Sequence, residues 1–200
     1  MPDSQWQTFA ELLKEARNIE FDAGLTDAEV ADIERSYAIR FPPDLREFLQ
    51  TALPVSDGFP NWRTDSAESI QERLAIPLEG VLFDIEHNDF WLAEWGPKPP
   101  QIEDAKKFAR QLIAEAPRLI PVYKHRMIPD RPHEAGNPVF SVHQTDIIYY
   151  GVDFRDYLIH EFLAENHGFW PIPDDIRKIH FWDIERFLNV RWADGVAVFD

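Results

Sequence analysis

Residues 137–151 constrain the fold of this chain more than any other segment. Two apolar runs within residues 138–150 flank a polar turn around Gln144 and Thr145, which predicts a β-hairpin. A helix is expected from Asp153 to about Ala164, directly after the hairpin. Residues 119–123 predict another strand, in which Pro121 favours a position at the edge of a sheet.

The amino-terminal part of the chain has helical periodicity. Trp6, Phe9 and Leu13 recur at three- and four-residue steps in the expected helix 5–19. Thr26 followed by Glu29 is the pattern of a capping box, in which each side chain bonds the other residue's backbone N–H. Prolines at 42 and 43 are expected to end this second helix and open a third, and residues 174–188 predict a last helix.

The middle of the chain changes its period. We expect a short helix over residues 66–74, and then a strand over 78–86 because Val81, Phe83 and Ile85 alternate with other residues. Residues 87–89 are expected to turn, and residues 90–95 to return as a second strand. Together these elements predict one α+β domain over residues 1–200, with an antiparallel sheet of about five or six strands and helices packed against it.

Charge limits the partners that this chain can bind. Its 36 acidic and 20 basic residues give a formal net charge of −16, and residues 1–100 alone carry −12. Such a chain repels phosphate backbones, so direct nucleic-acid binding is not expected. It favours a protein partner with a basic surface, although solubility alone also explains an acidic composition.

Several classes of protein and site are not expected. With no cysteine, the chain can form neither disulfides nor thiolate sites. No apolar stretch is long enough to span a membrane and no signal peptide is recognisable, so the expected location is the cytoplasm. His160-Glu161 begins like a metalloprotease motif, but position 164 is alanine where the second histidine is required. No catalytic, metal or cofactor site is predicted.

The segment 79–95 is the main candidate for a binding surface. It carries five acidic residues, no lysine or arginine, and four large aromatic residues. Acids steer a basic partner and aromatic side chains anchor it, although an ordinary hairpin with aromatic residues inward is the simpler interpretation. A tryptophan in the loop 54–63 is a second candidate, unless it folds back over the core. The candidate partner-binding residues are Asp57, Trp62, Asp84, Glu86, Asp89, Trp91, Glu94 and Trp95.

Four segments in order resemble the SUKH superfamily. These are residues 24–30, residues 41–49 with their Pro-Pro-Asp turn, the block 78–96, and most closely residues 137–151. The resemblance covers about residues 20–165. It implies helices packed on an antiparallel sheet, and a function in protein interaction. Bacterial members include many immunity proteins that neutralise toxins, and fungal relatives regulate cell-wall assembly.

Three functions remain open from the sequence. The first is a non-enzymatic immunity protein that occludes a basic toxin, such as a nuclease. The second is a regulator or scaffold that binds a peptide or small ligand in a pocket lined by Trp91, Trp95 and Tyr149. The third is a hydrolase with an unconventional carboxylate or histidine site.

Overall fold

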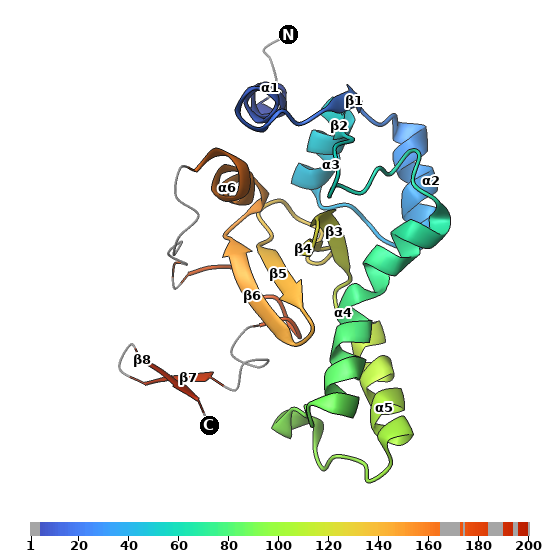
Figure 1. Ribbon diagram of the computed structural model, residues 1–200, viewed down its shortest axis with the longest axis vertical. Coiled ribbons are helices and arrows are strands. Elements are labelled where there is room, and N and C mark those ends of the chain that lie inside the picture. Colours follow the sequence, from blue (N-terminus) through green and yellow to red (C-terminus); the bar gives the residue numbers. More distant parts are fainter. Residues whose placement is uncertain (1–4, 165–172, 174, 184–189, 194–195, 200) are drawn as a thin grey trace.

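The computed structural model describes residues 5–164, 173, 175–183, 190–193 and 196–199, with the backbone alone in the last two ranges. Helices dominate its first half and antiparallel strands its second (Figure 1). The helices are α1 (Gln5–Arg17), α2 (Asp27–Tyr37), α3 (Pro43–Thr51), α4 (Ala67–His87), α5 (Ile102–Glu115) and α6 (Phe154–Leu158), with a 3-10 turn η1 (Ala93–Trp95) and a π-helix η2 (Ile159–Leu163). The strands are β1 (Phe21–Ala23), β2 (Ala52–Pro54), β3 (Leu119–Tyr123), β4 (Arg126–Pro129), β5 (Val139–His143), β6 (Asp146–Gly151), β7 (Val190–Ala193) and β8 (Val196–Phe199).

The amino-terminal helices form as their sequence predicts. Helix α1 buries Trp6, Phe9 and Leu13 on one face. At the start of α2, the Thr26 hydroxyl accepts from the backbone of Glu29 and the Glu29 carboxylate accepts from the backbone of Thr26, so the capping box is confirmed. Helix α3 begins with prolines, as expected, because the first N–H groups of a helix have no acceptor within the helix and proline lacks only such a group.

A four-stranded antiparallel sheet, in the order β3-β4-β5-β6, forms the centre of the fold. The expected hairpin is confirmed, with Val139 opposite Gly151 and His143 opposite Asp146. The edge position expected from Pro121 is also confirmed, because β3 is the outer strand. Strands β1–β2 and β7–β8 pair separately. The described residues therefore form an α+β fold whose largest sheet has four strands rather than five or six.

The central sheet separates two hydrophobic clusters. Ile120, Ile128 and Val139 face the cluster built by α1, α2, α3 and α6. Met127 and Phe140 face the other cluster, which includes α4, α5 and the segment 176–182. Because neighbouring strand residues point to opposite faces, the same short strands serve both clusters.

The prediction for residues 66–95 is wrong in its strands. Residues 67–87 form one long helix, α4, which runs beside α5 in Figure 1, and residues 90–95 contain only a 3-10 turn. Val81, Leu82 and Ile85 are buried at helical spacing, whereas Phe83 is exposed. The helix continues through Pro77, which supplies no N–H for the carbonyl four residues earlier but is itself buried. Burial of the helical face outweighs that loss.

The carboxyl-terminal predictions have mixed outcomes. The helix expected over residues 153–164 forms as α6 and then widens into η2, where the Ala164 N–H donates to the carbonyl of Ile159. Residues 175–183 form turns and irregular structure instead of the helix expected over 174–188, and the rest of that range lies outside the described residues. None of the helices described here is long and apolar enough to cross a membrane.

Candidate partner-binding surface

The outer face of α4 carries an exposed aromatic residue between acids. Phe83 is 45% exposed, the largest value among the large hydrophobic side chains of the described residues. Glu79, Glu86 and His87 are exposed, each about one turn away from Phe83 on the same side of the helix. The rings of Phe83 and His87 lie 4.4 Å apart. We call Glu79, Phe83, Glu86 and His87 the Phe83 stripe.

Asp84 does not belong to this surface, although the sequence placed it there. It is 4% exposed and points to the central sheet. Its carboxylate accepts from the backbone N–H of Thr145 at 2.9 Å, from the Thr145 hydroxyl at 2.6 Å, and from Asn88 Nδ2 at 2.5 Å. Asp84 therefore holds α4 against the β5–β6 turn and is unavailable to a partner.

Lysines from the following segment approach the acids of the candidate surface. Lys106 on α5 pairs with Glu86 and lies 3.9 Å from Glu103. Lys98 Nζ lies 2.5 Å from Asp89 Oδ1. Hydrogen bonds from these ammonium groups, and their positive charge, lower the pKa of both Glu86 and Asp89. Both acids stay outside the core and remain ionised at neutral pH, so the surface keeps an acidic character.

The two tryptophans of the segment pack together in the connection that follows α4. The rings of Trp91 and Trp95 meet edge to face at 5.1 Å, and Trp91 Nε1 donates to the carbonyl of Gly96 at 2.8 Å. Trp95 also stacks on Phe181, and Trp91 packs against Phe108. Both tryptophans are half-buried, so they support the α4–α5 connection. Glu94 is exposed next to them.

Tyr149 does not complete a pocket with these tryptophans in the way the ligand-binding hypothesis requires. Its ring is buried on the sheet, 5.0 Å from the ring of Phe140. The Tyr149 hydroxyl lies 3.3 Å from Asp183. Tyr149 is thus a core residue with a polar end.

Trp62 is a lid over the core, as the simpler interpretation held. It is 6% exposed and packs edge to face on Phe41 at 5.1 Å. Asp57, in the same loop, is exposed and lies near Lys124, whose pKa is raised chiefly by Tyr123 and slightly by Asp57. Trp62 is therefore not available as an anchor for a partner.

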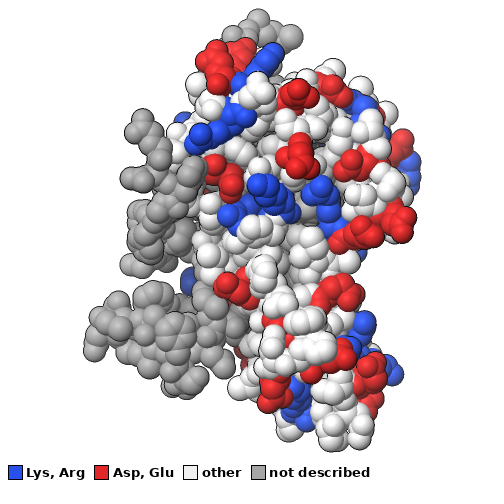
Figure 2. All heavy atoms as spheres, viewed as in Figure 1, with Lys and Arg blue, Asp and Glu red and all other residues white. Residues whose placement is uncertain are grey.

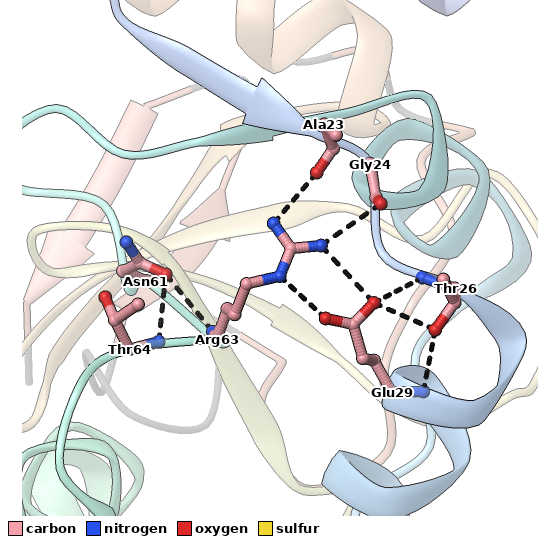
Figure 3. A network of polar contacts seen from close by, with 7 residues as sticks. All are labelled: Ala23, Gly24, Thr26, Glu29, Asn61, Arg63 and Thr64. Carbon is pink, nitrogen blue, oxygen red and sulfur yellow. Dashed lines mark hydrogen bonds and ion pairs between the residues drawn. The ribbon is translucent and has the colours of Figure 1, made fainter.

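Arg63, the residue after Trp62, holds the loop 54–63 in place (Figure 3). Arg63 Nε lies 2.6 Å from Glu29 Oε1, and its two Nη atoms donate to the carbonyls of Ala23 and Gly24. Glu29 is the acid of the α2 capping box, so one carboxylate stabilises both the helix start and the loop. Hydrogen bonds from Arg63 and Thr26 lower the pKa of Glu29 to about 2.

A polar cluster around Arg126 was missed by the sequence analysis. Arg126 Nε donates to Glu161 Oε2 at 3.1 Å, and Nη1 donates to Ser141 Oγ at 2.7 Å. The guanidinium also lies 3.6 Å from the centre of the Tyr150 ring. His125 lies against it, and burial together with the Arg126 charge lowers the pKa of His125. Since its guanidinium is already occupied, Arg126 ties η2 to the sheet rather than serving as an open site.

The histidines and acids of the described residues do not assemble into a metal site. Within residues 5–164 and the shorter described segments, no group of three such side chains could hold an ion. His160 is buried, with Nδ1 3.0 Å from the carbonyl of Tyr150, and its ring stacks on that tyrosine. His167, seven residues further along the chain, lies outside the described residues.

The chain matches no protein-family model, and it shows no significant similarity to a curated protein or to a solved structure.

Proposed function

We propose that this chain is a non-enzymatic protein-binding domain of the SUKH type. Its role is that of an immunity protein, which neutralises a basic toxin by covering the toxin's active surface. The Phe83 stripe on α4 is the contact surface. The observation that carries the proposal is the exposed Phe83 ring held between carboxylates on a rigid helix.

The chemistry of the stripe supports a basic partner. Four carboxylates lie on or beside it, from Glu79, Glu86, Asp89 and Glu103, against two lysines, Lys98 and Lys106. In Figure 2, acidic side chains are spread over the visible face of the molecule, interspersed with lysines and arginines. An exposed aromatic ring contributes contact area at the centre of an interface, and the surrounding charge accelerates encounter and selects the sign of the partner.

Capture with matched variants tests this proposal. The wild-type chain, immobilised, is exposed to lysates of toxin-producing bacteria at low and high salt, beside the double variant Glu79→Lys/Phe83→Ala. The control is Glu11→Lys/Leu12→Ala on α1, because Leu12 is 42% exposed and also has an acidic neighbour. We expect a basic protein that the wild type and the control retain at low salt and the α4 variant loses.

Two results would contradict the proposal. A partner lost equally from both double variants would show that α4 is not the contact surface. A captured toxin that stays active in the complex would show that binding does not neutralise it by occlusion.

A further inference from the structure

A groove of about 760 Å³ lies on the other side of α4 from the Phe83 stripe. Its walls come from the end of α2, the first half of α4, the end of α5 and the residues that lead into β3. This volume is within the range of about 300–1,000 Å³ that small-molecule sites occupy. The groove contains none of the candidate residues discussed above.

The floor of the groove is apolar. Leu74, Leu78 and Ile113 line it and are only half-buried, which leaves part of each side chain open to the groove. Pro77 and Trp182 also line the groove and are themselves buried. An apolar body that enters the groove would therefore remove hydrocarbon surface from water.

The charged residues of the groove are both arginines. Arg110 and Arg118 line it, and no aspartate or glutamate does. A groove lined by two arginines and no acid is unusual in a chain with a net charge of −16. Within the described part of the chain, neither guanidinium forms an ion pair.

One end of the Arg118 guanidinium is held by backbone carbonyls. Its Nη1 donates to the backbone carbonyls of Tyr37 and Ala38, at 2.6 and 3.0 Å, which fixes the guanidinium at the end of α2. Among the described residues, no acceptor occupies its Nε or Nη2. These two groups form the edge of a guanidinium that binds a carboxylate through two parallel hydrogen bonds. The hydrogen bonds of Nη1 to Tyr37 and Ala38 therefore leave the Nε–Nη2 edge of Arg118 without a partner among the described residues.

We propose that this groove binds a small amphiphilic carboxylate, with the acid on Arg118, the charge of Arg110 nearby, and the hydrocarbon on Leu74, Leu78 and Ile113. The site is separate from the protein-binding surface on the opposite side of α4. It would let a small metabolite occupy the protein independently of a protein partner.

Two detergents with the same dodecyl tail but opposite charge test whether the groove prefers an anion to a cation. Dodecanoate and dodecyltrimethylammonium are titrated into the whole chain by calorimetry, each below the concentration at which it forms micelles. Non-specific attraction to a chain of charge −16 would favour the cation. We expect saturable one-to-one binding of dodecanoate, with methyl NMR shifts at Leu74, Leu78 and Ile113, and weaker binding of the cation.

Variants that each remove one positive charge test whether Arg118 and Arg110 contribute to binding of the carboxylate. Arg118→Gln keeps an amide that can donate to the same carbonyls, and Arg110→Gln removes a side chain that has no bonding role in the described structure. Each should weaken dodecanoate binding, by about tenfold for Arg118, the value of one charge-assisted contact. Lys14→Gln on α1 removes the same charge elsewhere and should change the affinity little.

The proposal is overturned by any of three results. These are no saturable dodecanoate binding, binding of the cation as tight as that of the anion, or unchanged dodecanoate affinity in a folded double variant Arg110→Gln/Arg118→Gln.

Discussion

The Asp84 carboxylate on α4 accepts hydrogen bonds from both the backbone N–H and the hydroxyl of Thr145 in the β5–β6 turn. One side chain thus joins the long helix to the hairpin that most constrains the fold. The backbones also approach closely here, because a Cβ built on Gly80 would lie 2.6 Å from the Cα of Gln144. Helix α4 is therefore fixed to the sheet at one turn, and its outer face is held rigidly toward solvent.

Asp84→Ala should lower the free energy of unfolding by about 2–4 kcal/mol. The change removes the acceptor of three hydrogen bonds and leaves the partly buried backbone N–H of Thr145 without its acceptor. Urea denaturation measures the loss. Glu79→Ala, on the exposed side of the same helix, should change stability by less than about 0.5 kcal/mol. Equal effects of the two changes would contradict the anchoring role.

Gly80→Ala should also destabilise, although alanine is normally better than glycine inside a helix by about 1 kcal/mol. The new methyl group would meet the backbone of Gln144 at 2.6 Å, and that backbone can yield only if the turn moves away from α4. We expect a loss of about 1–3 kcal/mol, as for overpacking of a core. The ordinary preference of a helix for alanine over glycine is measured by thermal unfolding of Gln111→Gly and Gln111→Ala, on the exposed side of α5. A gain in stability for Gly80→Ala would show that the contact is not tight.

The pH dependence of stability should report the ion pair of Glu29 with Arg63. The pKa of Glu29 is lowered from 4.5 to about 2, so folding favours the ionised carboxylate. Its contribution is therefore fully present above pH 4.5 and is lost as the pH falls through the interval from 4.5 to about 2. Wild type should lose its advantage over Glu29→Gln across that interval. The measurement is urea denaturation from pH 6 to about 2.

A matched change at another helix surface controls for general acid sensitivity. Arg35 and Asp32 form an ion pair on α2 in which both side chains are largely exposed. Removing it with Asp32→Asn should give only a small difference in stability from wild type, because exposed pairs contribute little. If the two variants followed the same pH profile, the network in Figure 3 would not be the cause.

The fold was predictable where local signals agree with burial, and not where they conflict. The capping box at Thr26, the prolines before α3 and the polar turn of the β5–β6 hairpin each specify a local geometry, and all three elements formed. In the range of α4, Val81, Phe83 and Ile85 alternate with other residues, which predicted a strand after a short helix. The structure buries Val81 and Ile85 and exposes Phe83, so helical packing overrides the apparent period of two.

The candidate surface was predictable only in part, for a related reason. The run of acids and aromatic residues did mark a real exposed stripe, but assigning it to strands reversed the roles of Phe83 and Asp84. The lysines that approach Glu86 and Asp89 follow in the next segment, at positions that only the α4–α5 pairing reveals. No local spacing could have joined Arg126 to Glu161, which are separated by 35 residues in sequence.

Arg126 and Glu161 should show a measurable coupling energy in a double-mutant cycle. Their side chains are only 13% and 18% exposed, so removal of one partner leaves a poorly solvated charge. We expect Arg126→Met alone to cost about 2–3 kcal/mol, less than for a fully buried pair because some solvent reaches the site. The double variant Arg126→Met/Glu161→Gln should cost less than the sum of the single changes, with a coupling of about 1–2 kcal/mol.

Arg177 and Glu134, a more exposed pair at 3.4 Å, provide the control cycle and should couple by less than about 1 kcal/mol. Additive effects at Arg126 and Glu161 would mean that the Tyr150 ring and Ser141, rather than Glu161, hold the guanidinium in place.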